Sequence, residues 1–466
     1  MKKNYLSMFM AIAMIASGAS FFSSCEKTPA GNEGENTENN GGNQGGENQG
    51  GENQGGGNQE EGTYIDVKAG EDLQTAIFNA PKGAIVRVQG GVTFEGNIKF
   101  VEGVTLSGGW NSTFTECGAE DLENLTIIDA KGSGRALEQH RIKPEGSDAY
   151  ADYVIPTVVS GFELKGGNTD NGAGAWIRKN GILEYCYIHD NTASSSGAGV
   201  RVEIDGIVRN CEISNNTCAN NGGGAYVYGT LENCEITFNK ANNNCGGGAQ
   251  IHGAGKMINC TVAKNSAKNG GGIRVYSNGG MIAGCLIAGN TATETTEGKK
   301  AGSGIVLNGN CSVINCSIVA NISNYEVSTE SGPALYFGDS SSDSPVKNCV
   351  IWGNTMNGNA SGRQIKGTRT GIENCAVAGG DSVDPYVIDL SYDETATTGT
   401  DGVDTWDRPA PGFVAAQSNI FRLASSSVLI DKGVNSFLPE NLTKDIEGEA
   451  RISGEKVDLG AFEYQN

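Results

Sequence analysis

The sequence lacks the residue spacings that common metal sites require. It has 3 histidines in 466 residues, and His140, His189 and His252 do not form a metal-ligand spacing. None of the 13 cysteines forms a Cys-x-x-Cys pair, which disfavours a zinc site. No defined calcium motif is present, although Asp/Asn-rich turns such as Asp190-Asn191 leave Ca²⁺ open as a cofactor. We therefore identify no cofactor from the sequence.

Positive charge is also scarce. The chain has 33 Lys and Arg against 54 Asp and Glu, a net charge of -21. Such an acidic chain disfavours nucleic acid and anionic membrane surfaces as partners. Aromatic residues are few, at 7%, whereas the 70 glycines are about twice the ordinary share.

The apolar stretch at the N-terminus is too short to span a membrane comfortably. Met8–Phe22 follows Lys2 and Lys3, which is the pattern of a secretory signal peptide over residues 1–24. The end of this stretch, Ser-Ser-Cys25, resembles a lipoprotein processing site, with Phe22 where a strict motif has Leu. The start as a whole resembles that of Bacteroidetes lipoproteins. This resemblance implies that Cys25 carries a lipid anchor.

Residues 25–62 have the composition of a tether. After Cys25 the segment repeats Asn-Gln-Gly-Gly, lacks aromatic residues and carries eight Glu and one Lys, a net charge of -7. Such a segment cannot bury enough apolar surface to fold alone, and 37 flexible residues span roughly 30–36 Å. A Glu-containing stretch after a lipidated cysteine resembles surface-export signals. This implies an outer-membrane lipoprotein exposed on the cell, attached to the membrane only through its lipid.

A phrase of the form Cys-x-(Ile/Val) recurs along the middle of the chain, and an Asn usually follows five residues after the Cys. Successive cysteines are 25, 23, 26, 25, 31, 33 and 26 residues apart, a period typical of stacked units. Seven copies are complete, and in the eighth Gly380 replaces the Asn. The copies begin at Cys186, Cys211, Cys234, Cys260, Cys285, Cys316, Cys349 and Cys375.

A glycine-rich phrase separates these copies. It opens with Gly-x-Gly and continues as a short alternating strand, as in Gly172–Ile177, Gly222–Val227 and Gly270–Val275. Glycine permits a sharp corner that a Cβ atom would hinder. Each period thus holds at least two short strands and leaves no room for a helix. Parallel strands stacked coil upon coil satisfy this pattern, so we expect an all-β fold, a parallel β-helix over residues 63–410.

The repeated side chains are expected to form columns, because equivalent residues of neighbouring coils lie about 4.8 Å apart. Cys and Ile/Val are two residues apart, so both point into the interior. The Asn column is expected to satisfy polar groups at a corner. Stacked cysteines have parallel Cβ vectors, so we expect reduced thiols in the column. The pairing of the remaining cysteines stays open for Cys117, Cys218, Cys245 and Cys311.

The Gly-Gly-Ala/Ile and (Ile/Val)-x-x-Asn phrases resemble the repeats of polymorphic outer-membrane protein adhesins, where Phe is usual in place of Ile/Val. The wider pattern is similar to right-handed parallel β-helix proteins of the pectate-lyase type. The resemblance covers residues 63–380. It implies a right-handed β-helix and leaves the activity open, since that superfamily contains lyases and non-enzymes.

The sequences at the two ends of the repeat region differ from the repeat. Glu71–Ala80 has helical spacing of apolar residues and predicts a short capping helix, followed by a first coil at Ile85–Val88. Residues 411–466 resemble the choice-of-anchor Q ending of secreted bacterial proteins. In that C-terminal cap we expect Arg451 to pair with nearby carboxylates, namely Asp431, Asp445, Asp458 and Glu463.

Alternation along the glycine-rich strands predicts one outward face. The inward positions are apolar, so their neighbours point outward and align from coil to coil. Aromatic rings can stack on sugars there, and arginines can bind carboxylates with two hydrogen bonds. The plainer alternative is that Tyr and Arg simply suit a solvated strand face. The candidate ligand-binding residues are Trp176, Arg178, Arg201, Tyr226, Tyr228, His252, Arg274 and Tyr276, with Glu203, Gln250 and Tyr336 in the same rows.

Two functions fit this face. A monomeric adhesin or glycan-binding protein would take a polysaccharide, glycoconjugate or host-surface ligand. Alternatively, a polysaccharide lyase acting on an acidic glycan needs a base and a group that neutralises the uronate, for which Arg201, Arg274, His252 and Tyr276 are the candidates. A hydrolase would need paired carboxylates, and the outward rows offer only Glu203. We favour the binding protein over the enzyme, and a purely structural surface rod is the third class.

Overall fold

The computed structural model describes residues 63–122, 124–294, 302–324, 332–338, 343–356, 359–360, 364–367, 371–378, 387–388, 423, 427 and 429–465. The signal peptide, Cys25, the tether, Gly380 and residues 411–422 of the expected cap lie outside this range. No helix among the described residues is both long enough and apolar enough to cross a membrane.

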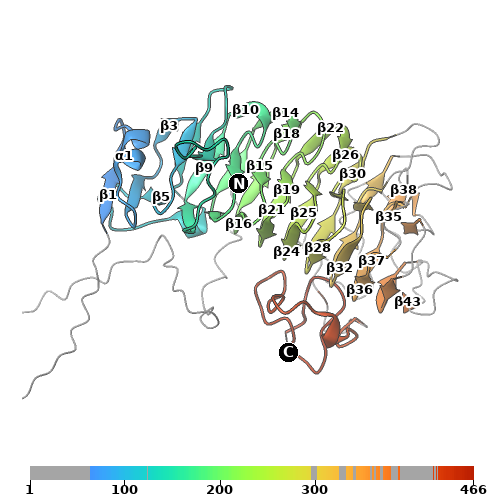
Figure 1. Cartoon of the computed structure of the whole chain (residues 1–466). Helices are drawn as coiled ribbons and strands as arrows, with labels where there is room; N and C mark the ends of the chain where they lie inside the picture. The colour runs from blue at the N-terminus through green and yellow to red at the C-terminus, as the bar shows by residue number, and fades with distance from the viewer. Residues whose placement is uncertain are drawn as a thin grey trace, which may run out of the picture.

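Four sheets run along one elongated body (Figure 1). A typical coil visits them in the order A, B, D and C, and the paired strands are parallel, apart from the last pair of sheet D. The predicted fold, a right-handed parallel β-helix, is confirmed. Sheet A contains β1 Tyr64–Val67, β2 Ile85–Gln89, β5 Thr105–Trp110, β8 Thr157–Ser160, β12 Gly181–Glu184, β16 Ile207–Arg209, β20 Thr230–Glu232, β24 Lys256–Ile258, β28 Gly280–Ala283, β32 Cys311–Ile314, β36 Val346–Lys347 and β41 Ile372–Glu373.

The other three sheets follow the same stacking. Sheet B contains β3 Thr93–Glu95, β6 Thr126–Asp129, β9 Phe162–Lys165, β13 Tyr187–His189, β17 Glu212–Ser214, β21 Glu235–Thr237, β25 Thr261–Ala263, β29 Leu286–Ala288, β33 Ser317–Val319, β37 Val350–Trp352, β42 Cys375–Val377 and β43 Val387–Ile388. Sheet D contains β10 Asn168–Asn171, β14 Thr192–Ser196, β18 Thr217–Cys218, β22 Lys240–Cys245, β26 Ser266–Asn269, β30 Thr291–Ala292, β34 Ile322–Ser323, β38 Thr355–Met356 and β39 Asn359–Ala360. Sheet C contains β4 Ile98–Phe100, β7 Leu137–Gln139, β11 Ala175–Ile177, β15 Val200–Val202, β19 Ala225–Val227, β23 Ala249–Ile251, β27 Ile273–Val275, β31 Ile305–Leu307, β35 Leu335–Phe337 and β40 Ile365–Lys366.

The corners explain the glycines and many of the asparagines. Gly222 opens sheet C at φ 63°, and a Cβ on Gly224 would lie 2.7 Å from the Gly248 carbonyl oxygen of the next coil. Between sheets A and B the residue before the ladder cysteine is usually left-handed, as at Asn210 (φ 52°) and Asn233 (φ 51°). Gly and Asn are the residues that adopt such conformations most readily. The repeat thus encodes its own turns.

The ladder cysteines line the interior as free, buried thiols, as predicted. Cys211 donates its S–H to the Arg209 carbonyl at 3.1 Å, and burial raises the pKa of this thiol well above its usual range. Cys218, Cys245 and Cys311 are free and buried too. The interior is therefore a neutral, apolar column.

The asparagines form a continuous hydrogen-bonded column at the corner between sheets B and D. Asn265 donates from Nδ2 to Asn290 Oδ1 (3.0 Å) and to the Ile236 carbonyl (2.8 Å), and its backbone N–H donates to the same Asn290 oxygen. The column ends on Gln364, whose Oε1 accepts from Asn354 at 2.8 Å. Its members, all nearly fully buried, are Asn191, Asn216, Asn239, Asn265, Asn290, Asn321 and Asn354.

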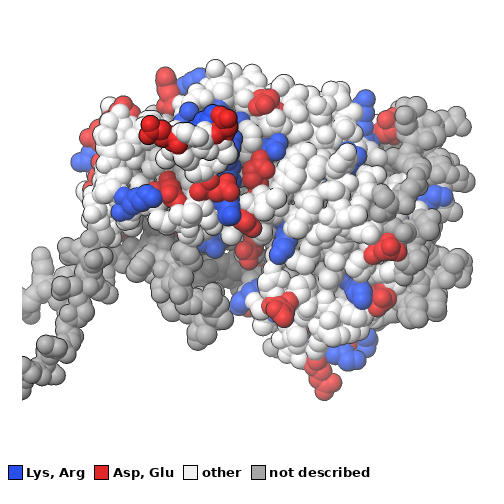
Figure 2. All heavy atoms as spheres, viewed as in Figure 1, with Lys and Arg blue, Asp and Glu red and all other residues white. Residues whose placement is uncertain are grey.

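Charged side chains occupy the outside of the rod. On the face visible in Figure 2, acidic and basic groups are interspersed. Several are paired across neighbouring coils, as between Arg209 and Glu184 at 2.6 Å and between Lys347 and Glu373 at 3.3 Å.

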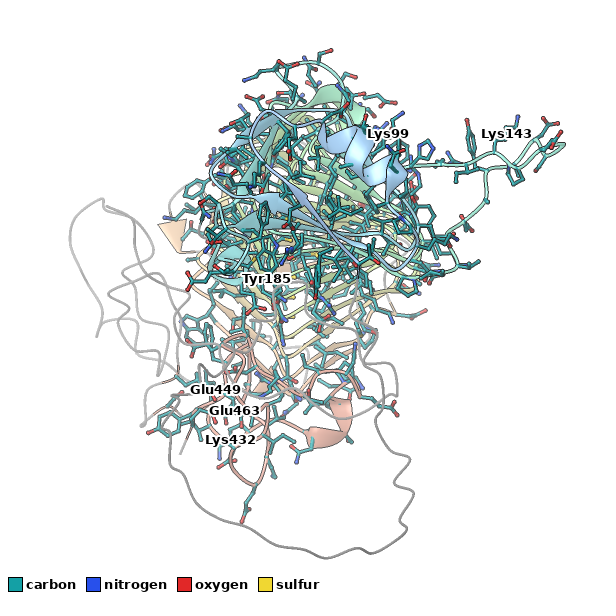
Figure 3. All side chains as sticks on the ribbon, turned by 90° about the vertical axis from the view of Figure 1, so that its left-hand side faces the viewer. Lys99, Lys143, Tyr185, Lys432, Glu449 and Glu463 are labelled. Carbon is teal, nitrogen blue, oxygen red and sulfur yellow. The ribbon has the colours of Figure 1, made fainter. Side chains whose placement is uncertain are left out.

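The predicted capping helix is present as α1, Leu73–Asn79. Asp72 caps it by accepting from the Thr75 backbone N–H at 3.0 Å, and α1 lies across the near end of the coils in Figure 3. One detail of the prediction was wrong: the first strand is β1, which precedes α1 and pairs with β2. Strand β1 alternates too weakly in polarity to be recognised from sequence.

The C-terminal segment, residues 429–465, covers the flank of sheet B (Figure 1). Leu429, Leu459 and Phe462 pack on outward apolar side chains of sheet B, including Val350 and Trp352. Asparagines of the A–B corner hold its backbone, with Asn315 Nδ2 donating to the Asp458 carbonyl at 2.9 Å. Its described contacts lie along the side of the coils, from Asn259 to Asn374, and not over an end.

No carboxylate among the described residues pairs directly with Arg451 as expected, although the charges of Glu463, Asp445 and Asp458 act on it. Arg451 is 2% exposed and donates to the backbone carbonyls of Ala461 (2.8 Å) and Gly460 (2.6 Å). The carboxylates accept backbone N–H groups instead, because the turns of this segment supply many unpaired donors. Asp445 accepts from Glu449, for example, at 2.9 Å. Short helix η4, Asn435–Phe437, belongs to this segment, and η1, Ala119–Asp121, to an early coil.

Candidate functional site

The outer face of sheet C aligns the predicted residues in two rows. Backbone pairing places Trp176 beside Arg201, Arg201 beside Tyr226, Tyr226 beside Gln250 and Gln250 beside Arg274. The row continues through Val306 to Tyr336. The second row, two residues further along each strand, contains Arg178, Glu203, Tyr228, His252 and Tyr276. The register inferred from the repeat is therefore correct.

The N-terminal part of this face is an arginine cluster around one indole. The guanidinium carbons of Arg178, Arg135 and Arg201 lie 4.2, 4.7 and 4.9 Å from the centre of a Trp176 ring. Cation–π attraction accounts for this geometry. Sequence reasoning missed Arg135, which stands before β7, outside the cysteine repeat. We call Trp176 with Arg135, Arg178 and Arg201 the Trp176 cluster.

Glu203 fixes two members of the cluster. Its Oε1 accepts from Trp176 Nε1 at 3.0 Å and from Arg201 Nε at 2.7 Å. The two terminal nitrogens of Arg201 donate to no residue in the described part of the chain, and the Arg201 side chain is 20% exposed. Arg201 also lies 5.2 and 5.5 Å from the ring centres of Tyr226 and Tyr228.

The middle of the face is a stack of four rings. His252 lies 4.6 Å from Tyr226, 4.8 Å from Tyr228 and 4.9 Å from Tyr276, measured between ring centres. Tyr276 is 53% exposed and forms the rim of the stack, with the Arg274 guanidinium 5.0 Å from its centre. The face thus offers ring surface and arginine side by side.

His252 is held neutral within this stack. Burial and the charges of Arg274 and Arg201 lower its pKa to about 4. Its Nε2 lies 2.5 Å from Gln250 Nε2. His252 (8% exposed) and Gln250 (2%) were expected on an exposed row, and that expectation was wrong because the neighbouring rings cover both.

Arg274 is tied to the protein. Its Nε donates to Asn308 Oδ1 at 3.1 Å, and Nη1 lies 3.3 Å from Asn221 Oδ1. Asn308 follows β31 and Asn221 precedes β19, so neither belongs to the repeated phrases that guided the sequence prediction. Tyr336, at the far end of the row, is also buried.

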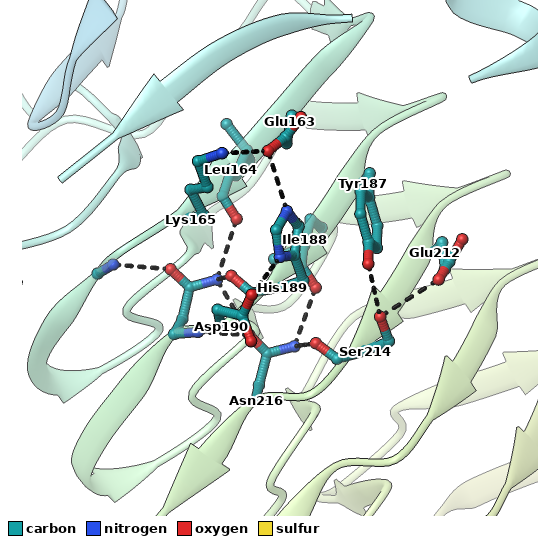
Figure 4. Close-up of polar contacts among 12 residues, drawn as sticks. Glu163, Leu164, Lys165, Tyr187, Ile188, His189, Asp190, Glu212, Ser214 and Asn216 are labelled. Atoms are coloured by element: carbon teal, nitrogen blue, oxygen red, sulfur yellow. Dashed lines mark hydrogen bonds and ion pairs between the residues drawn. The ribbon is translucent and has the colours of Figure 1, made fainter. Parts of the chain in front are cut away.

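A second polar cluster lies on sheet B (Figure 4). His189 lies between two carboxylates, with Nδ1 2.8 Å from Asp190 and Nε2 3.2 Å from Glu163, and it stacks on Tyr187 at 4.0 Å. Ser214 contacts Glu212 at 3.2 Å, and burial raises the pKa of that carboxyl. Among the described residues, no group of three or more His, Cys, Asp or Glu side chains is arranged to hold a metal ion.

The comparisons with known proteins leave the activity of this chain open. No family model matches the sequence, and no curated protein matches it. One solved structure that matches is the pectate lyase Pel9A, at 13% sequence identity and a TM-score of 0.47. The match covers 87% of this chain and 96% of that one. At that score the likeness says nothing about activity, so function has to be inferred from the outer face of sheet C.

Proposed function

We propose that this protein is a cell-surface β-helix lipoprotein that binds glycans through the outer face of sheet C. One observation carries the proposal: the rings of Trp176, Tyr226, Tyr228 and Tyr276 follow one another along the sheet beside arginines. Ring faces stack on the C–H faces of sugars, and arginine donates to sugar oxygens. A rigid strand scaffold keeps this spacing fixed.

The location is part of the same proposal. Lipidation of Cys25 and the acidic tether would hold the rod away from the outer membrane, so that the face can meet soluble or cell-bound glycans. Metabolic labelling with a fatty acid tests this: label should enter the native chain and be lost from Cys25→Ala. Surface proteolysis of intact cells distinguishes outward from periplasmic display.

Binding is tested with a triple variant, Trp176→Ala, Tyr226→Ala and Tyr276→Ala. We expect retention on immobilised glycans and on host cells to fall by at least tenfold, with the circular dichroism spectrum unchanged. Phe238→Ala, an exposed ring that follows β21 of sheet B (54% exposed), is the matched control. If the triple variant is retained as well as the native protein, this face is not the binding site. If the native protein binds none of the immobilised glycans and no host cells, a purely structural rod is favoured.

A lyase acting on an acidic glycan is the second candidate, because His252 is neutral and lies beside two arginines. A base must reach the C5 proton of the sugar. His252 is 8% exposed and enclosed by tyrosine rings, which favours binding over elimination. Incubation with pectin, alginate and glycosaminoglycans decides the matter, since elimination produces unsaturated sugars that absorb near 230 nm.

A further inference from the structure

The charges of the Trp176 cluster are unevenly paired. Arg135 pairs with Glu138 at 2.6 Å and lies 3.9 Å from Asp170, and Arg201 pairs with Glu203 at 2.7 Å. Arg178 has no carboxylate within ion-pair distance among the described residues and donates to the Gln139 carbonyl at 2.9 Å. Crowding like charges in a half-buried place costs free energy unless an anion compensates.

Burial and the neighbouring arginines act on Arg178 in the same direction. Loss of solvent, together with the charges of Arg141 and Arg135, lowers the pKa of Arg178 to about 10. Glu138 also lies 3.7 Å from Lys99, so its single charge is shared between two cations. Together with Lys99, the three arginines are four cations beside three carboxylates, which leaves one positive charge in excess.

Arg201 presents the open side of this cluster. Its Nε is occupied by Glu203, which orients the guanidinium plane, and the edge formed by Nη1 and Nη2 has no described acceptor. A guanidinium edge with two parallel N–H groups matches a carboxylate, which accepts both hydrogen bonds at once. Trp176 and Tyr228 supply ring faces on either side of this edge.

We propose that the Trp176 cluster is a binding site for the carboxylate of an acidic sugar, and that Arg201 is the residue that binds this carboxylate. This rests on the proposed glycan-binding function and names its ligand class as glycans that contain a hexuronate or another carboxylated sugar. Rings beside the guanidinium favour a carboxylate carried on a sugar over a free inorganic anion, because only the sugar offers a C–H face for stacking.

The experiment compares a carboxylated polymer with its carboxyl-reduced form. Full-length mature protein is titrated with polygalacturonate, alginate and hyaluronan, each before and after chemical reduction of the carboxyl groups to alcohols. Arg201→Gln is the test variant. Arg209→Gln is the control, because Arg209 lies on the outer face of sheet A and pairs with Glu184 there. Thermal unfolding of each variant confirms that it folds.

We expect the native protein to bind at least one carboxylated polymer at least tenfold more tightly than its reduced form. Arg201→Gln should remove that difference and leave binding of the reduced polymer unchanged, whereas Arg209→Gln should alter neither. Equal affinity for both forms would overturn the proposed carboxylate-binding site but not the proposed glycan binding. Failure to bind either form would overturn both.

Discussion

The outer faces of sheets B and C are built on the same coils and differ in what covers them. On sheet B the later coils carry apolar side chains such as Val350 and Trp352, and the C-terminal segment packs on them. On sheet C the coils of β11 to β27 carry arginines and aromatic rings, among which Tyr276 is 53% exposed. The first face is buried against the chain itself, whereas the second keeps an exposed ring at Tyr276.

This difference shows that a repeating core does not dictate its surface. The inward positions vary little, because each must fill the same interior. The outward positions are free to change coil by coil, so each sheet acquires its own chemistry.

Replacing Arg451 should release residues 429–465, which cover sheet B, from the side of the coils. In Arg451→Met the carbonyls of Gly460 and Ala461 lose their donor, and the nearby buried carboxylates lose the positive charge that opposes the rise in their pKa. We expect a loss of about 3–5 kcal/mol in the stability of the docked segment, as is usual for a broken buried ionic site. Proteolysis of residues 429–465 should accelerate, with no change for exposed Lys432→Met. Unchanged protection would refute this role.

The cover of sheet B should weaken as the pH rises. Burial raises the pKa of Glu463 to about 7, so the stability that this group contributes is complete below about pH 4.5 and is lost as the pH rises through 7. This pKa shift changes the free energy of unfolding by about 3 kcal/mol at most. Glu463→Gln should flatten this dependence in denaturant titrations at pH 5 and pH 8. A native protein with equal stability at both values would contradict the prediction.

The ring stack of sheet C should weaken in the opposite direction. The pKa of His252 is lowered to about 4, so its contribution is present above about pH 6.5 and is lost as the pH falls through 4. The effect is again about 3 kcal/mol at most. Tyrosine fluorescence during acid unfolding reports on the stack. In His252→Gln the midpoint of acid unfolding should shift to lower pH. An unchanged midpoint would argue against burial of a neutral imidazole.

The smallest effect concerns two exposed rings, one on each face. Tyr276→Ala on sheet C and Phe238→Ala after β21 should each change the free energy of unfolding by less than about 0.5 kcal/mol, because both side chains are more than half exposed. Only Tyr276→Ala should reduce glycan retention, by a few-fold. If both variants or neither lose retention, the two faces do not differ as proposed.

The repeat predicted the fold because its chemistry is local. Cys211 and Ile213 show the strand period, Asn210 and Gly222 set the corners, and the 25-residue spacing sets the stacking. The same register predicted that Trp176 lies beside Arg201, as the strand pairing confirms. These features depend only on neighbouring residues in the sequence or on the next copy.

Features that depend on distant segments could not be predicted in this way. Arg135 joins the Trp176 cluster from a coil without the cysteine repeat, and the burial of His252 depends on rings from the two neighbouring coils, those of β19 and β27. The flank position of residues 429–465 depends on apolar side chains of sheet B that the sequence does not distinguish from core residues. Outward Leu286 and inward Ile287 look equally apolar.

The asparagine column also gives the rod a direction. Within the column each side-chain amide donates to the amide of the next coil and accepts from the amide of the previous one, so these bonds from Asn191 to Asn354 all run in one direction and reinforce one another. Each coil presents the same donor and acceptor to its neighbours, so removal of one whole coil, such as residues 211–233, would let the column rejoin. Lengthening or shortening the rod by complete coils is therefore tolerated by this column, whereas a partial coil would break it.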